Sequence, residues 1–278
     1  MREHQWIVKG GRALGPAPFF IAGIVNVTPD SFHDGGRYLE HDAALARGLA
    51  LAEEGAQILD LGGESTRPGA AETPEPEELA RVVPVIRALA AGCSAALSVD
   101  TYKAKVAAES LAAGAHIVND VSACRFDPAL VEVLAQEKPG YVLMHSQGKP
   151  REMQKNPTYR DVVEEILAFF EERLQYLVQR GLPEERIVLD PGIGFGKSLE
   201  HNLTILKHID RFQTLGRPVY VGLSHKSMFQ GLLGLGPGQR GTATQVATAL
   251  LAAKGVAVHR VHDVADTVRT LKLAAAML

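Results

Sequence analysis

The sequence has little cysteine and little excess charge. Its 278 residues include one tryptophan and two cysteines, Cys93 and Cys124. The cysteines form neither a disulfide framework nor a metal-ligand spacing, so we expect a reducing compartment. The net charge is −3 and the pI is about 6.4. Without a basic field, we expect no nucleic-acid partner and no membrane partner, and any anionic ligand needs a local cluster of cations.

Long hydrophobic runs are also absent. The apolar stretch from Phe19 to Val25 is far too short to span a bilayer. The first residues, MREHQW, lack the apolar segment of a secretory signal peptide. No low-complexity linker or change in composition divides the chain. We therefore expect a cytoplasmic protein with one main domain.

Several motifs that would indicate nucleotide binding, zinc binding or serine-hydrolase activity are missing. The glycine-rich stretch at residues 192–197, GIGFGK, is neither a dinucleotide-binding fingerprint nor a Walker A loop. The histidines show no H-E-x-x-H or other zinc spacing, so we expect no zinc. No serine stands in a G-x-S-x-G elbow, which argues against a serine hydrolase.

What the sequence does have is a recurring pattern, clearest at residues 187–197. There Ile187-Val188-Leu189 forms an apolar run that ends at Asp190 and continues into a glycine-rich turn. Such runs are typical of strands buried on both faces of a parallel sheet. The pattern predicts eight strands, at residues 19–25, 57–61, 95–99, 117–118, 141–144, 187–189, 219–223 and 256–259.

Helical spacing of apolar residues separates these strands. It predicts helices at residues 42–54, 76–90, 103–113, 128–136, 159–180, 199–209, 243–253 and 264–277. Eight strand–helix units are the number that a (β/α)8 TIM barrel requires. We assign residues 19–278 to the barrel, and residues 1–18 to an N-terminal arm or hairpin that plugs its bottom. A doubly wound open sheet is the alternative, but such folds concentrate their chemistry at one switch point.

Polar side chains follow nearly every predicted strand. In a barrel all the carboxyl ends open on one face, so these side chains converge. The acids and the asparagines suit a flat heterocycle with an amidine-like N–H edge, and the cations match a phosphate or diphosphate. The converging residues are Asn26, Thr66, Arg67, Asp100, Asn119, Asp190, Lys226, Arg260 and His262.

Each of these residues has a plainer explanation when taken alone. Asp100 and Asp190 could be the N-caps of the helices that follow them. Asn26 could form a turn, the two late cations could end solvated loops, and His262 could cap a helix or pair with Asp263. Together these explanations require many independent coincidences at one face, which favours a shared site.

Eight motifs in this order resemble those of dihydropteroate synthase, a pterin-binding family. The resemblance runs from about Phe19 to the C-terminus. The motifs are IVNVTPDSF (24–32), GGESTRPG (62–69), SVDT (98–101), NDV (119–121), LMH (143–145), DPGIGFGK (190–197), HKS (225–227) and RVHDV (260–264).

The resemblance implies a transferase of folate biosynthesis and a target of sulfonamides. It implies condensation of 6-hydroxymethyl-7,8-dihydropterin pyrophosphate with 4-aminobenzoate, which gives dihydropteroate and pyrophosphate. It further implies Mg²⁺ as cofactor and a homodimer. Two loops, residues 27–37 and 64–72, would close over the site. The alternatives are a corrinoid-linked methyltetrahydrofolate methyltransferase and a silent pterin-binding paralogue.

The resemblance also implies a role for each site residue. Asn26 would ligate Mg²⁺, Arg67 and His262 would contact the phosphates, and Thr66 and Ser224 would lie near the aminobenzoate. The residues implied around the pterin are Asp100, Asn119, Met144, Asp190, Phe195, Lys226 and Arg260. Those implied in catalysis are Asp100, Lys226, Arg67 and Asn26.

One position departs from the family pattern. The family commonly has Ser-Arg-Lys where this chain has Ser224-His225-Lys226. The lysine is kept, so we expect the pterin contact to be kept. The change to His225 affects whatever the family's arginine contributes elsewhere, such as support of a loop or packing of a dimer.

Overall fold

The computed structural model describes residues 2–27, 37–65, 69–148 and 151–278, with no account of the side chains of residues 37–40. Eight parallel strands form its centre. Their order is β8-β7-β6-β5-β4-β3-β10-β9, and a bridge between Leu189 and Val219 brings the two ends together. The strands are β3 (Phe20–Asn26), β4 (Ile58–Gly62), β5 (Ala96–Asp100), β6 (Ile117–Asp120), β7 (Gly140–Met144), β8 (Ile187–Asp190), β9 (Tyr220–Gly222) and β10 (Val258–Val261).

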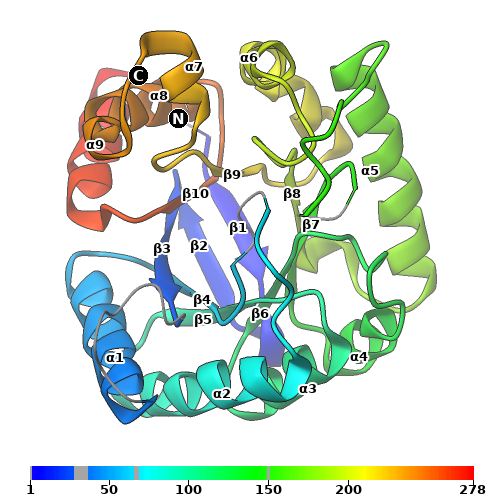
Figure 1. The fold of residues 1–278 in the computed structure, drawn as a ribbon, viewed down its shortest axis with the longest axis vertical. Coiled ribbons are helices and arrows are strands. Elements are labelled where there is room, and N and C mark those ends of the chain that lie inside the picture. The colour runs from blue at the N-terminus through cyan, green and yellow to red at the C-terminus, as the bar shows by residue number, and fades with distance from the viewer. Residues whose placement is uncertain (1, 28–36, 66–68, 149–150) are drawn as a thin grey trace.

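This sheet forms a nearly closed barrel, so the predicted (β/α)8 TIM barrel is confirmed. Helices follow the strands and surround them (Figure 1). They are α1 (Arg37–Glu53), α2 (Glu75–Gly92), α3 (Ala104–Ala112), α4 (Leu130–Glu137), α5 (Val162–Gln179), α6 (Leu199–Lys207), α7 (Met228–Leu233), α8 (Gly241–Ala253) and α9 (Val264–Met277). Short 3-10 turns lie at Lys9–Gly11, Glu184–Arg186, Ile209–Leu215 and Pro237–Gln239.

One helix and one strand end differ from the sequence-based prediction, each for a physical reason. The six-residue α7 was not predicted, because one and a half turns are too short to show helical periodicity. The last strand was expected to end at His259, before Arg260, because a charged residue usually marks an exit from the core. β10 instead continues to Val261 with Arg260 paired opposite Ala22 of β3.

The strands place alternate residues inside the barrel, and the character of those residues changes along its axis. Near the amino ends they are apolar and form one buried cluster that includes Phe20, Ile58, Ile117 and Tyr220. Two residues further along, the inward positions are polar on β4, β5, β6, β8 and β10, as at Asp60 and Asn119. The opposite faces of the strands pack against the helices in a second, larger core. The apolar inner cluster therefore supports a polar layer at the carboxyl ends.

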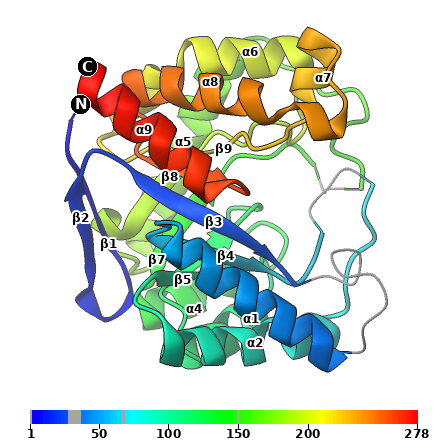
Figure 2. The ribbon, with the colours of Figure 1, turned by 90° about the vertical axis from the view of Figure 1, so that its left-hand side faces the viewer.

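An antiparallel hairpin of β1 (His4–Ile7) and β2 (Ala13–Ala17) covers the amino ends of the strands. Trp6 is fully buried in the inner apolar cluster, and its Nε1 donates to the carbonyl oxygen of Arg186 at 2.7 Å. Figure 2 shows the hairpin at one end of the barrel, where β3 begins. The assignment of residues 1–18 as a separate arm stays a prediction.

Within the described part of the chain, no helix combines the length and the apolar character that crossing a membrane requires.

Candidate active site

A narrow cavity opens at the carboxyl ends of the strands, and it brings seven of the predicted site residues together. About 20 Å³ of it is free, which is room for one water molecule. Val121, Gly192, Ile193 and Gly222 complete its lining. The predicted residues that line it are Asp100, Asn119, Met144, Asp190, Phe195, Lys226 and Arg260.

Arg260 crosses the cavity and binds two carboxylates. Its Nε donates to Asp60 Oδ2 at 2.6 Å, and its Nη2 donates to Asp100 Oδ2 at 2.7 Å. Burial by itself would lower the pKa of Arg260, but the two carboxylates raise it above its ordinary value. Arg260 is therefore a fixed cation inside the barrel and not the solvated end of a loop.

Asp60 was missing from the predicted set, although it connects the site. It is fully buried. Besides Arg260 it accepts hydrogen bonds from Ser98 Oγ at 2.6 Å and from Asn119 Nδ2 at 3.1 Å. Since Asn119 gives one amide hydrogen to Asp60, its amide group has a fixed orientation at the cavity wall. The signal was present in the sequence, because a lone acid inside the apolar strand at 58–62 needs buried partners.

Asp100 leaves one acceptor without a partner. Oδ2 binds Arg260, whereas Oδ1 is buried and has no hydrogen-bond partner among the described residues. Burial raises the pKa of this carboxyl, Arg260 opposes the rise, and the nearby Asp60 charge adds to it. An acid in this state suits a ligand that brings an N–H donor. The alternative that Asp100 caps a helix is wrong, because the N-cap of α3 is Lys103.

Asp190 stands at the end of β8 and stabilises the turn that follows. Its Oδ1 accepts from the Gly192 N–H at 2.8 Å, so it caps this turn but no helix; the N-cap of α6 is Ser198. Burial raises its pKa to about 6, although the Gly192 N–H and the charge of Lys226 act in the opposite direction. The cations near Asp190 thus stabilise its ionised form, and this carboxylate can accept a hydrogen bond from a ligand.

Two lysines flank Asp190, of which Lys197 is buried and Lys226 is half-buried. Lys226 Nζ lies 4.5 Å from the ring centroid of Phe195, and burial lowers its pKa to about 8. Lys197, which was not predicted, places its Nζ 3.0 Å from both His145 Nδ1 and the Phe195 carbonyl oxygen. Burial lowers the pKa of Lys197 to about 7. These contacts fix the glycine-rich turn against the end of β7.

Three predicted residues lie at the same end of the barrel but do not line the cavity. Asn26 is exposed at the end of β3. Ser224 Oγ lies 2.9 Å from His262 Nδ1, which joins the ends of β9 and β10. Thr66 and Arg67 lie outside the described residues, as do residues 28–36 of the first predicted loop.

The unusual His225 also has a definite contact. Its Nε2 lies 2.7 Å from Asp263 Oδ2, and its carbonyl oxygen accepts from Arg240 Nη1 at 2.9 Å. This histidine therefore connects the turn after β9 to the start of α9. Asp263 therefore has His225 as a partner; the suggested pair of Asp263 with His262 stays a prediction.

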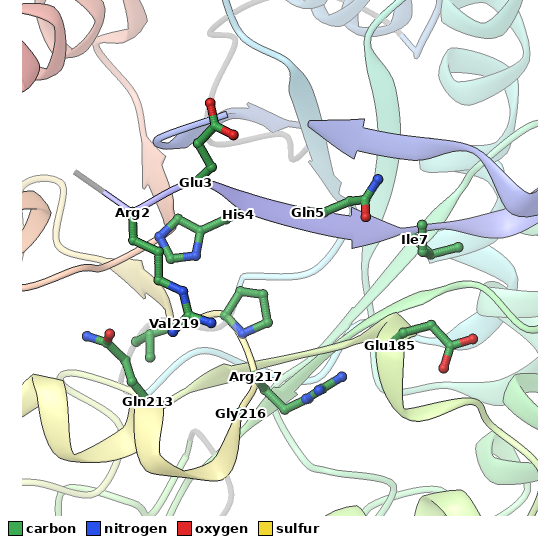
Figure 3. A pocket seen from close by; sticks show the side chains of 11 residues that line it. Arg2, Glu3, His4, Gln5, Ile7, Glu185, Gln213, Gly216, Arg217 and Val219 are labelled. Atoms are coloured by element: carbon green, nitrogen blue, oxygen red, sulfur yellow. The ribbon is translucent and has the colours of Figure 1, made fainter. Parts of the chain in front are cut away.

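A wider cavity lies at the other end of the barrel. Its volume is about 240 Å³, and it separates β1 from the segment before β9. Figure 3 shows Arg2 and His4 of the N-terminal segment near Gln213, Arg217 and Val219. None of the predicted site residues lines it. The predicted site residues therefore gather at the smaller cavity.

Among the described residues, no cluster of three or more His, Cys, Asp or Glu side chains could hold a metal ion. Mg²⁺ commonly binds through one or two protein oxygens together with substrate phosphates. Asn26 is exposed, and its amide oxygen fits a site in which one protein oxygen and substrate phosphates hold Mg²⁺ together.

Known proteins match this chain over nearly its whole length. A sequence model of the family described as pterin binding enzyme matches residues 22–262. The dihydropteroate synthase of Escherichia coli K12 is 42% identical over 268 residues, which cover 96% of this chain and 95% of that protein. The chain belongs to this family, as a dihydropteroate synthase. The membership does not favour the methyltransferase or the silent paralogue.

Solved structures agree with this membership. A structure titled as dihydropteroate synthase from Xanthomonas albilineans in complex with 7,8-dihydropteroate has a TM-score of 0.89 and 42% identity. It covers 99% of this chain and 98% of its own. A Yersinia pestis dihydropteroate synthase with a sulfonamide drug complex has a TM-score of 0.91 and 42% identity, and covers 97% and 98%.

The contacts of Asp60 predict a large effect on stability. Asp60→Ala removes the buried acceptor of Arg260 Nε and of Asn119 Nδ2, so we expect the free energy of unfolding to fall by about 3–5 kcal/mol. Asp266→Ala is the matched control, because Asp266 also pairs with an arginine, Arg269, but both side chains are largely exposed. We expect that variant to lose about 1 kcal/mol or less. Denaturant unfolding measures both, and similar losses would contradict the assignment.

Proposed function

We propose that this protein condenses 6-hydroxymethyl-7,8-dihydropterin pyrophosphate with 4-aminobenzoate to form 7,8-dihydropteroate and pyrophosphate. One observation carries the proposal beyond family membership. The cavity presents the unpartnered Oδ1 of Asp100 beside Asn119, Asp190 and Lys226. Carboxylates and an oriented amide suit the N–H edge of a pterin.

The pterin would lie among Asp100, Asn119 and Asp190, with Met144 and Phe195 packing around it. Arg260, held by two carboxylates, would offer its guanidinium plane to the ring. Lys226 Nζ lies 4.5 Å from the centroid of the Phe195 ring, so both side chains stand at the same wall of this cavity.

The diphosphate would extend toward the outer residues at the carboxyl ends of the strands. We propose Arg67 and His262 as its contacts, and Thr66 and Ser224 near the aminobenzoate. Asn26 would hold Mg²⁺ together with diphosphate oxygens, and this ion neutralises charge on the leaving group when bound. These roles rest on the family resemblance and on the position of Asn26, Ser224 and His262 at the correct end of the barrel.

The reaction would follow a dissociative course. The bond between the pterin methylene carbon and the diphosphate oxygen breaks, and its electron pair leaves with diphosphate. The remaining cation is delocalised into the pterin ring, where Asp100 stabilises it electrostatically. The aminobenzoate nitrogen then gives its lone pair to the methylene carbon and loses a proton. No covalent enzyme intermediate is required.

The deciding experiment measures pyrophosphate release from the pterin substrate with Mg²⁺, with and without 4-aminobenzoate, and detects dihydropteroate by mass spectrometry. We expect release coupled to dihydropteroate. Release without this product would mean that another nucleophile is used. Tight pterin binding without any release would return the methyltransferase or the silent binder as the better explanation.

The raised pKa of Asp190 predicts how pterin binding depends on pH. The acid must be ionised to accept two N–H groups, so protonation below a pKa of about 6 removes the acceptor. We expect the affinity of the free enzyme for a pterin to fall by about tenfold per pH unit below that value. Asp190→Asn should bind weakly, with a reduced slope. Calorimetric titration measures both, and a flat wild-type profile would contradict this role.

We also propose a homodimer and a cytoplasmic location. Two neighbouring helices at the C-terminal side expose large apolar side chains at i, i+4 spacing. Val246 and Leu250 on α8 are 56% and 61% exposed, and Leu273 and Met277 on α9 are 63% and 78% exposed. Such a patch is typical of an interface. A second copy of this chain is the partner that the family resemblance implies, and the two free cysteines suit a reducing compartment.

Charge on this patch should separate the subunits. We expect Leu250→Glu and Leu273→Glu to convert the protein from a dimer to a monomer, because a charge inside an apolar interface lacks a partner. Val178→Glu on α5, at a position that is 42% exposed, is the control and should remain dimeric. Light scattering after size exclusion gives the mass. A monomeric wild type would sink the proposal.

A further inference from the structure

Lys103 joins both ends of a segment that flanks the site. Its side chain forms an ion pair with Glu64, just after β4, and its Nζ donates to the carbonyl oxygen of Thr73, just before α2. The distance to the Thr73 oxygen is 2.6 Å. The chain thus contacts this ammonium group at Glu64 and again at Thr73, nine positions later. Lys103 itself is only 7% exposed.

A third acceptor fixes the ammonium group from the side of the helix. Lys103 Nζ donates to Glu78 Oε2 at 2.5 Å, and Glu78 on α2 is 1% exposed. Burial raises the pKa of Glu78, and the contact with Lys103 opposes this rise. Burial would lower the pKa of Lys103, but the two glutamates raise it. The ammonium group is therefore charged and fully coordinated by its three acceptors.

Neighbouring side chains strengthen the same junction. Arg81 on α2 donates from Nη1 to the carbonyl oxygen of Gly63 at 2.6 Å, and Tyr102 donates to Glu64 Oε1 at 3.2 Å. These two contacts fix Glu64, the first residue of the segment, and Gly63, the residue before it. Both ends of the segment are thus tied to α2 and to the residues that follow β5.

Stability alone does not explain this arrangement. A buried ion pair is often replaced by apolar residues without loss of stability, whereas its geometry is specific. Lys103 also follows Asp100 by three residues, and its N–H is fixed by Thr101 Oγ1 at 3.2 Å. The junction therefore sets the ends of the segment relative to the strand that carries a site carboxylate.

We propose that Lys103 is a positioning residue for the two ends of this segment, Glu64 and Thr73, between which Thr66 and Arg67 stand in the sequence. This inference rests on the proposed synthase function, in which those two residues contact the aminobenzoate and the diphosphate. Within the described part of the chain, the side-chain hydrogen bonds of Lys103 reach no residue that lines the pterin cavity. Its loss should therefore affect the reaction with aminobenzoate more than pterin binding.

The test compares Lys103→Met with Lys105→Met. Lys105 lies on α3, is largely exposed and makes only a 3.5 Å contact with Glu75, so its variant should behave as wild type. For Lys103→Met we expect kcat/KM for aminobenzoate to fall by about a hundredfold, since small misplacements of positioning groups have effects of this size. The dissociation constant for a pterin should change by less than about threefold, and amides at the two described ends of the segment, residues 64–65 and 69–73, should exchange faster with solvent.

A second variant separates positioning from stability. Lys103→Met leaves two buried glutamates without a cation, and this alone can destabilise the fold. Lys103→Met with Glu78→Gln removes one of these charges. We expect it to recover most of the lost stability in thermal unfolding, while the activity and the fast amide exchange stay as in the single variant.

Each outcome decides the matter. Recovery of activity together with stability would overturn the inference, because Lys103 would then have only a structural role. An equal loss of pterin affinity and turnover would also overturn it. If wild type and Lys105→Met are both inactive, the proposed function fails. Amide exchange still tests the junction in that case, and unchanged exchange in Lys103→Met would overturn the junction as well.

Discussion

The buried contact between Arg260 and the two carboxylates of Asp60 and Asp100 is the constraint on which the site depends. It links β10 to β4 and β5 across the barrel interior. Charged groups are stable there only when each finds a partner, so the position of one residue restricts all the others. Asp60 accepts three hydrogen bonds and thereby orients Asn119, while Asp100 is left with one oxygen for a ligand.

This polar layer exists because the barrel has two different ends. The N-terminal hairpin with Trp6 closes the amino ends and completes an apolar inner cluster. That cluster excludes water from beneath the polar layer, and burial then raises the pKa of the acids and lowers the pKa of Lys197 and Lys226. A ligand that offers N–H groups and negative charge would satisfy both kinds of group at once.

The barrel and the converging strand ends could be predicted because each strand repeats one local pattern. An apolar run that stops at a polar residue is visible without knowledge of its neighbours. Asp60 and Lys197 could not be predicted in this way. Asp60 stands inside a run, and Lys197 looks like the solvated end of a turn. Their partners, Arg260 and His145, are remote in sequence, so only the folded barrel shows which groups these two charges contact.

For the same reason Lys103 could not be predicted from the sequence. Its neighbours there are typical of the start of a helix. The stretch from Asp100 to Lys103 in fact carries two buried networks. Asp100 faces Arg260 inside the barrel, and Lys103 faces Glu64 and Glu78 outside it. Thr101 fixes the turn between them, since its N–H donates to the Asn119 carbonyl oxygen at 3.0 Å. A short rigid stretch after β5 thus relates the pterin cavity to the ends of the segment beside it.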